Sequence, residues 1–177
     1  MEQYRKSPRA KWIDYNEGMY FVTICTRQRR HYFGKISNEK MELSCIGELV
    51  YAELENANRR YAHITIPQFV VMPNHIHAII VVDSPTHQRC VPTSQERVCR
   101  RLHTTVRPLL STYIGLFKSY ITKSARTIDP TFGWQSRYHD HVIRDIHDGN
   151  LISEYIENNV LKWDLDCFND GNILSCK

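Results

Sequence analysis

The stretch ITIPQFVVMPNHIHAIIVVD, residues 64–83, decides the fold class of this chain. It contains two runs rich in β-branched residues, 64–73 and 74–83, which meet at Pro73-Asn74. Runs of this composition on either side of a tight connection predict two neighbouring β-strands. In the second run histidines alternate with apolar residues, so one face of the strand is predicted to carry two imidazoles and the other face to be packed.

Before this pair of strands, the sequence predicts a strand, a short hairpin and a helix. Residues 20–26, YFVTICT, are β-branched and aromatic and predict a strand, and residues 31–44 predict a hairpin that turns around 37–39. After Ser44, a suitable N-cap, apolar residues recur at steps of three and four and predict a helix to about Arg60. The apolar positions of this helix are Ile46, Leu49, Val50, Leu54, Ala57 and Tyr61.

After the pair of strands, the sequence predicts a loop, a helix, a strand and a last helix. Residues 84–107 show weak periodicity and predict the loop. Pro108 is expected to begin the second helix and residues 134–144 to form the fourth strand with its approach. The last helix is expected to begin at Asp148 or a close neighbour and to run to about Lys162. Its inner side is expected to carry Ile152, Tyr155, Ile156, Asn159, Val160 and Trp163.

The predicted order of strands and helices matches the βαββαβ arrangement of a ferredoxin-like α+β fold, with one helix added at the C-terminus. This arrangement implies an antiparallel sheet whose helices cover one face and leave the other face available for a ligand. A chain of 177 residues, 42% hydrophobic and 24% charged, is sized for one globular core. We therefore expect a single domain over residues 1–177, with its core at about 18–166.

The sequence indicates neither a membrane segment nor a cysteine-based metal site. No apolar run is long enough to cross a bilayer, and no apolar signal segment follows the basic N-terminus. The six cysteines include no Cys-x-x-Cys pair, which favours reduced thiols over a zinc ribbon or a redox motif. These features predict a cytoplasmic protein that does not act in a membrane.

The distribution of positive charge suits a polyanionic partner, although the net charge of +4 is only mildly basic. Any single cluster of basic residues is equally compatible with a solvated surface. The basic residues gather in three groups: Arg27, Arg29 and Arg30; Arg97, Arg100, Arg101 and Arg107; and Lys118, Lys123 and Arg126.

His75 and His77 are two residues apart on a predicted strand, so both imidazoles project from the same face. Burying two unpaired imidazoles side by side costs free energy, and a shared divalent cation removes that cost. Oxygen atoms as the further ligands would favour Mg²⁺ or Mn²⁺, whereas thiolates would favour zinc. The alternative is two independent histidines, because a His-x-His pattern by itself is a weak signal.

Tyr155 and Asn159 are four residues apart on the predicted last helix and therefore lie on one of its faces. Asparagine is a poor helix former, and its amide oxygen is a suitable ligand for a hard cation. A tyrosine hydroxyl one turn away is placed to attack a phosphate bound to that cation. The alternative is a core tyrosine and an asparagine that caps the helix, and the spacing alone favours this alternative.

Several segments together resemble the single-tyrosine HUH transposases, and most closely the REP-associated tyrosine transposases. YFVTICTRQRR resembles the first strand of that family, and VMPNHIHAIIV resembles its signature, with His75-Ile76-His77 as the histidine, hydrophobic, histidine triplet. The segments LFKSYITK, WQSRYHDHVIRD and EYIENNVLKWDLD follow in the family's order and approximate spacing. The resemblance covers roughly residues 20–166.

The resemblance implies a role for each matching residue. His75, His77 and Asn159 would bind a divalent cation, Mg²⁺ or Mn²⁺, and Tyr155 would be the nucleophile. Val160 departs from the family, which usually has a proline at this position. Proline would break the helix, whereas valine could let it continue and aim Asn159 differently.

Other residues are expected to support the site or the fold. Tyr113 and Tyr120, the alternative nucleophiles, lie on the apolar stripe of the second predicted helix and are expected in the core. Three residues that match family positions are expected to shape the site and not to react: His141, Trp134 and Gln135. The candidate phosphate contacts are Arg27, Arg29, Arg30 and Lys118.

The resemblance implies a metal-dependent endonuclease and strand transferase that acts on single-stranded DNA with a hairpin nearby. Its tyrosine would form a 5′-phosphotyrosine link and leave a free 3′-hydroxyl, and the protein would act as a monomer or a homodimer. Three alternatives stay open. They are a catalytically silent relative that binds DNA hairpins, a metal-dependent phosphoesterase that uses water, and a structural zinc protein. The zinc protein would use two His-x-His pairs, His75 with His77 and His139 with His141.

Overall fold

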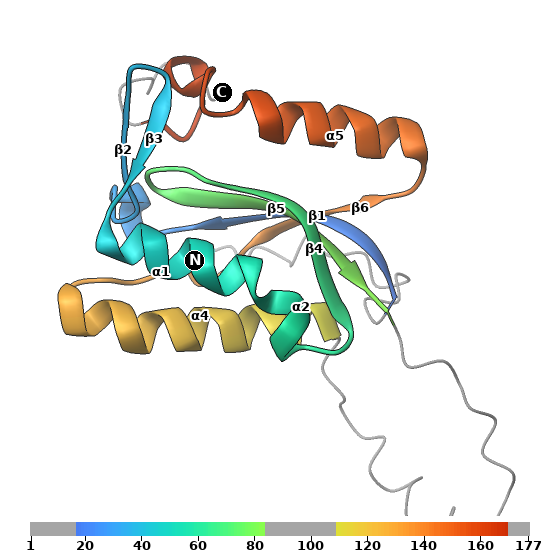
Figure 1. Ribbon diagram of the computed structural model, residues 1–177, viewed down its shortest axis with the longest axis horizontal. Helices are drawn as coiled ribbons and strands as arrows, with labels where there is room; N and C mark the ends of the chain where they lie inside the picture. The colour runs from blue at the N-terminus through green and yellow to red at the C-terminus, as the bar shows by residue number, and fades with distance from the viewer. Residues whose placement is uncertain (1–16, 84–108, 170–177) are drawn as a thin grey trace, which may run out of the picture.

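A four-stranded antiparallel sheet forms the centre of the computed structural model, which describes residues 17–83 and 109–169 (Figure 1). Its strands lie in the order β4-β5-β1-β6, so the two strands of the segment 64–83 are neighbours, as predicted. The Met72 N–H donates to the His75 carbonyl at 2.9 Å and closes the turn between them. The strands are β1 Gly18–Cys25, β4 Ile64–Val71, β5 His75–Val82 and β6 His139–Ile143.

Helices cover both faces of this sheet, and α5 lies on the face opposite α1, α2 and α4 (Figure 1). Strand side chains alternate, so Tyr20, Val22 and Ile24 of β1 enter the hydrophobic core beneath α1 and α4. Phe21 and Thr23 face α5 instead. This arrangement confirms the predicted α+β, ferredoxin-like fold with an added C-terminal helix. The helices are α1 Cys45–Glu55, α2 Ala57–Arg60, α4 Leu109–Ile128 and α5 Ile146–Asn158.

A separate hairpin of β2 Gly34–Ser37 and β3 Lys40–Leu43 joins β1 to α1, as predicted. Asn38 and Glu39 at its turn have positive φ angles of 51° and 59°, the combination that a two-residue type I′ turn requires. Gly34 also has a positive φ of 140°, and a β-carbon there would collide with the backbone of β3. Glycine is therefore required where this hairpin begins.

The first helix has the predicted cap but not the predicted length. The Ser44 hydroxyl accepts the Gly47 N–H at 3.1 Å, as an N-cap does. The prediction of one helix to about Arg60 is wrong, because Asn56 leaves the helical conformation at φ −92° and ψ 6°. The Asn56 side chain donates to the Ala52 carbonyl at 2.8 Å, and this bond competes with the continuation of the helix.

The last helix starts close to Asp148, as predicted, but ends earlier than predicted. The Asp145 carboxylate accepts the Asp148 N–H at 2.8 Å and caps α5, which ends at Asn158 and not near residue 162. The chain then turns into a short 3₁₀ helix, η3 Trp163–Leu165. Trp163 is only 7% exposed after this turn. Burial of its indole by the turn outweighs the periodic pattern that predicted a longer helix.

The fourth strand is confirmed at His139–Ile143, and its approach lies at 134–138. One further expectation needs correction. Tyr113 is buried in the core as predicted, but Tyr120 is 41% exposed and lies under the Arg60 guanidinium, 4.7 Å from its ring centroid. Tyr120 therefore lies at the edge of the apolar stripe of α4, where a neighbouring arginine covers it.

Some predictions fall outside the described residues: the loop at 84–107, its arginine cluster, and the cysteines Cys90, Cys99 and Cys176. The other three cysteines, Cys25, Cys45 and Cys167, are free thiols. Within 17–83 and 109–169, no helix combines the length and the apolar character that a bilayer crossing requires.

Candidate active site

The histidine pair lies on the sheet face that α5 covers. His75 lies opposite Cys25 of β1 and His77 opposite Thr23, so both imidazoles point to the same side of the sheet. Their side chains are 0% and 2% exposed. Ile76 between them points into the core. The structure thus brings the two imidazoles together in a buried setting.

The two imidazoles face each other through their Nε2 atoms, which are 3.0 Å apart. Behind them, the Asn74 amide oxygen accepts a hydrogen bond from His75 Nδ1 at 2.8 Å, which leaves a lone pair on Nε2 of the neutral ring. His77 Nδ1 is held by the Thr23 hydroxyl at 2.8 Å. Because a metal–imidazole bond is about 2.0–2.1 Å long, one divalent cation fits between nitrogens at this separation.

Burial keeps both imidazoles neutral. Desolvation lowers the pKa of His77 from 6.5 to about 3. Desolvation also lowers the pKa of His75 well below its usual value, and the neighbouring His77 and Arg29 add to this effect. A cation therefore has no proton to displace from either ring near pH 7.

Sequence reasoning missed a carboxylate that lies beside the pair. Asp166 Oδ2 is 3.8 Å from His75 Nε2, and the ligand atoms of His75, His77 and Asp166 all lie within 4.8 Å of one another. Burial raises the pKa of Asp166, and its other oxygen accepts the Phe168 N–H at 2.8 Å. No periodic pattern marks Asp166, because the turn after α5 is what brings it to the sheet.

The helix α5 brings Tyr155 to the histidine pair. The Tyr155 hydroxyl lies 3.3 Å from His77 Nε2, and its ring meets the Phe21 and His77 rings edge-on. Burial raises the pKa of Tyr155, and the nearby Asp166 raises it further, whereas a hydrogen bond with the Asn159 side chain lowers it. A neutral phenol of this kind needs assistance before it can act as a nucleophile.

Asn159, one turn further along, supplies a buried acceptor. Its side chain is 3% exposed, and its Oδ1 accepts no hydrogen bond from the part of the chain that the structure describes. An unpaired buried amide oxygen costs free energy that a bound cation would remove. Val160 does not extend α5, so its difference from proline leaves the helix end in place. These residues fit a hard divalent cation with imidazole, amide and carboxylate ligands.

The turn after α5 closes over His75. The Trp163 ring stacks on His75 with the centroids 6.1 Å apart, and the Phe168 ring lies 4.6 Å from the same imidazole. Arg29 donates to the Cys167 carbonyl at 2.8 Å and lies over the Phe168 ring. The Arg29 guanidinium thus stabilises the position of this turn. The expected contact of Arg29 with phosphate stays a prediction.

The other basic candidates lie at the surface around the sheet. Arg27 and Arg30 line a separate cavity of about 320 Å³. Lys118 donates to the Gln135 carbonyl at 2.9 Å and to the Arg137 carbonyl at 3.3 Å, so its ammonium group braces the approach to β6. Contact of these residues with DNA stays a prediction.

The residues expected to shape the site occupy two different places. His141 faces α5, and its Nε2 lies 2.9 Å from the Asp148 carboxylate at the start of that helix. Trp134 packs in the core against Phe117 and Phe132 and donates to the backbone. His141 therefore contributes to the docking of α5, whereas Trp134 supports the fold from the other face of the sheet.

Comparisons with known proteins agree with this fold. The chain is 34% identical over 165 residues to an uncharacterized protein of Haemophilus influenzae, with 92% of each chain covered. The solved structure of a REP-associated tyrosine transposase bound to a REP hairpin has a TM-score of 0.60 and 20% identity, over 89% of this chain and 74% of that chain. This match confirms the resemblance at the level of the fold.

A second solved structure, of a candidate transposase from Deinococcus radiodurans, has 12% identity over 86% of this chain and 97% of that chain. Its TM-score is 0.48. No protein-family model matches the chain.

Proposed function

We propose that this chain, which belongs to the same protein family as the Haemophilus influenzae protein, is a metal-dependent endonuclease and strand transferase for single-stranded DNA. Its fold is that of a REP-associated tyrosine transposase, and the solved example was bound to a REP hairpin. A single strand with a hairpin nearby is therefore the proposed substrate. The proposal assigns the chemistry to Tyr155 and the cation to the residues around His75 and His77.

One observation carries this proposal: the Tyr155 hydroxyl lies 3.3 Å from His77 Nε2, which in turn lies 3.0 Å from His75 Nε2. A phosphate held at the histidine pair would therefore be within reach of the phenol oxygen. A core tyrosine would not need two ligand nitrogens and the unpaired Asn159 oxygen beside it. The arrangement favours a reacting tyrosine over a packing one.

His75, His77 and Asn159 would hold the cation, with Asp166 as a further oxygen ligand. When bound, Mg²⁺ or Mn²⁺ would polarise the scissile phosphate and neutralise the negative charge that develops on it. Behind the imidazoles, hydrogen bonds between Nδ1 and neighbouring side chains fix the ring orientation, which is the usual support for a metal-binding histidine.

Tyr155 would attack phosphorus in line, forming an oxygen–phosphorus bond while the bond to the 3′-oxygen breaks. The products are a 5′-phosphotyrosine link and a 3′-oxygen that takes up a proton. Phe21 and Asn159 orient the phenol during this step. A different 3′-hydroxyl can then attack the link and restore Tyr155. Strands are rejoined without ATP, because one phosphodiester is exchanged for another.

The test incubates the full-length protein with a pool of 3′-labelled single-stranded oligonucleotides of random sequence and Mg²⁺ or Mn²⁺. A denaturant-resistant protein–DNA adduct is expected, and EDTA and Tyr155→Phe should both abolish it. Tyr120→Phe is the matched control, because it removes the hydroxyl of an exposed tyrosine on another helix. Mn²⁺ titration of His75→Ala should show weaker binding than the wild type.

Other outcomes would remove a part of this proposal or favour a different function. An adduct that persists in Tyr155→Phe would remove Tyr155 as the nucleophile, and wild-type affinity for Mn²⁺ in His75→Ala would remove the proposed metal site. Cleavage without an adduct would favour a phosphoesterase that uses water. Tight hairpin binding without cleavage in any metal would favour a binding protein, and stoichiometric bound zinc would favour a structural zinc site.

A further inference from the structure

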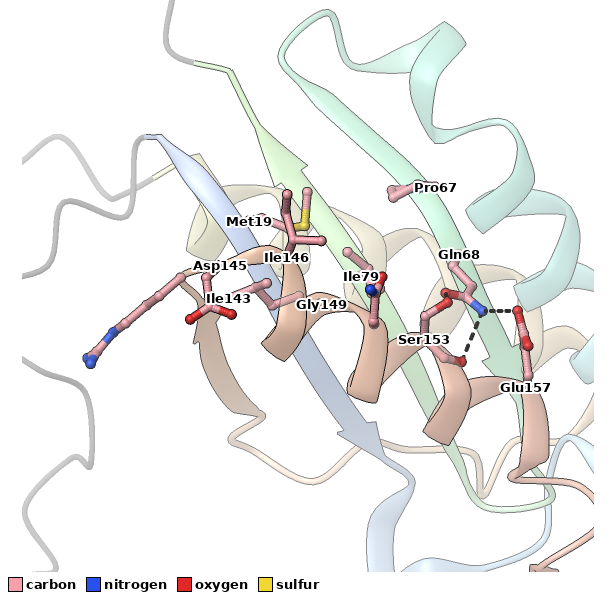
Figure 2. Close-up of a pocket in the computed structure, with 12 residues that line it drawn as sticks. Met19, Pro67, Gln68, Ile79, Ile143, Asp145, Ile146, Gly149, Ser153 and Glu157 are labelled. Atoms are coloured by element: carbon pink, nitrogen blue, oxygen red, sulfur yellow. Dashed lines mark hydrogen bonds between the residues drawn. The ribbon is translucent and has the colours of Figure 1, made fainter.

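A pocket of about 690 Å³ opens between α5 and the sheet, and we call it the Gly149 pocket (Figure 2). Figure 2 shows Gly149 on α5, close to Ile143 and Ile79 from the strands. Asn150 and Gln68 add carboxamides to this lining. The apolar part of the wall is formed by Met19, Ile79, Ile143 and Ile146.

The Gly149 pocket adjoins the candidate active site. Ile79 follows His77 on the same face of β5, about 7 Å further along the strand. Phe21, which lies opposite Ile79 on β1, stacks on His77 and meets Tyr155 edge-on. A strand whose phosphate lay at the histidine pair would therefore place a neighbouring nucleotide at the entrance of the pocket.

Polar contacts join α5 to the sheet on both sides of the pocket. The Ser153 hydroxyl donates to Gln68 Oε1 at 2.6 Å. Gln68 Nε2 donates to the Glu157 carboxylate and to the Ser153 carbonyl, both at 3.2 Å (Figure 2). Towards the start of the helix, His141 Nε2 and Asp148 Oδ2 are 2.9 Å apart. These contacts fix the position of α5 over the sheet at either end of the pocket.

Gly149 keeps the helix side of the pocket free of atoms. Glycine is less favourable than alanine in a helix, so its place in the first turn of α5 needs a reason. A β-carbon at Gly149 would meet only the Ile143 side chain, at the ordinary contact distance of 3.5 Å. Close packing against the sheet therefore does not require glycine, whereas an occupant of the pocket would benefit from the space.

A nucleobase suits the chemistry of this lining. Its flat apolar faces match the aliphatic wall, and its polar edge can bond the carboxamide of Asn150. The carboxylates of Asp145 and Glu157 disfavour a phosphate inside the pocket, while Arg144 offers a cation for the adjoining phosphate outside it. We infer that the Gly149 pocket receives one base of the DNA strand, next to the nucleotide whose phosphate lies at the histidine pair.

This inference rests on the proposed function and adds a base-binding subsite to it. Gly149→Leu tests it, because the leucine side chain projects into the pocket and leucine favours a helix more than glycine does. Gly115→Leu is the matched control, since a β-carbon at Gly115, in the middle of α4, meets nothing within 4 Å. Thermal melting of both variants by circular dichroism verifies that each one folds.

The full-length proteins are titrated in EDTA with fluorescein-labelled dA₁₂, dC₁₂ and dT₁₂ and with a 12-mer of abasic sites, and fluorescence anisotropy measures binding. Gly149→Leu is expected to bind at least one homopolymer about tenfold more weakly than the wild type, the scale of one lost base contact. Its affinity for the abasic 12-mer should be unchanged. Gly115→Leu should bind all four probes as the wild type does.

Equal affinities of wild type and Gly149→Leu for every homopolymer would overturn the inference. A Tyr155 adduct formed by the same wild-type protein would then leave the proposed function intact. An equal loss of affinity of Gly149→Leu for the abasic 12-mer would also overturn the inference, because the contact affected would then be to the DNA backbone and not to a base. So would a wild-type protein that binds no homopolymer. Light scattering that shows a wild-type dimer and a Gly149→Leu monomer would instead assign the pocket to an interface between two copies.

Discussion

Acidification of the metal-free protein should destabilise it through the histidine pair, well above the pH at which most carboxylates titrate. His77 is 2% exposed, and burial lowers its pKa from 6.5 to about 3 in the folded state. Between these two values the unfolded chain binds a proton that the folded protein does not bind. Stability is therefore complete above pH 6.5 and falls as the pH drops towards 3.

The size of the effect follows from the width of this window. One pKa unit corresponds to about 1.4 kcal/mol, so lowering the pH from 7.5 to 5.0 should cost about 2 kcal/mol from His77 alone. In a chain of this length, that loss lowers the melting temperature by about 4–8 °C. His75 acts in the same direction, because burial lowers its pKa as well.

The assay is differential scanning fluorimetry in EDTA between pH 7.5 and 5.0. His77→Gln removes the titrating ring and should flatten the pH dependence, whereas His147→Gln, at an exposed position of α5, should leave it unchanged. In parallel scans without EDTA, Mn²⁺ should raise the melting temperature of the wild type more than that of His77→Gln. If wild type and His77→Gln lose the same stability between pH 7.5 and 5.0, the argument that burial keeps these imidazoles neutral is wrong.

Two further predictions concern the metal ligands and the packing of α1. Asp166→Asn should weaken Mn²⁺ binding, measured by calorimetry, because the amide lacks the negative charge but can still accept the Phe168 N–H. Asp164→Asn, at an exposed position of the same turn, should bind Mn²⁺ as the wild type does. Equal Mn²⁺ affinities of the two variants would exclude Asp166 as a ligand. Gly47→Ala should destabilise the protein by roughly 1–3 kcal/mol in urea unfolding, because the new β-carbon collides with the Phe33 carbonyl. Gly115→Ala, where a β-carbon meets nothing, should stabilise the protein by about 0.5–1 kcal/mol. A stabilising effect of Gly47→Ala would contradict the packing described for α1.

Much of the site could be predicted because its parts obey local periodicities. A strand repeats every two residues, so His75 and His77 had to share a face once the segment 74–83 was extended. A helix repeats every 3.6 residues, so Tyr155 and Asn159 had to be neighbours on α5. The order of strands and helices then favoured a fold in which both pairs belong to one sheet face, and the structure brings them together.

The predictions that were wrong have a common cause: contacts of individual side chains outweighed the periodic pattern of apolar residues. Asn56 interrupts the first helix because its side chain bonds the backbone of the preceding turn. The periodic pattern after Asn158 suits a longer helix, but the chain turns and buries Trp163 against His75. Tyr120 belongs to an apolar stripe, yet Arg60 from another helix covers it and leaves it half exposed.

By itself the sequence determined the strand pair, the shared face of its histidines, and the spacing of Tyr155 and Asn159. Only the tertiary structure decided that Asp166 and Phe168 come to His75, and that a pocket lies beneath Gly149. The physical reason is the separation in sequence between the residues that interact. Periodicity sets the direction of a side chain within its own strand or helix, whereas a chain reversal and the docking of α5 on the sheet depend on contacts between residues far apart in sequence.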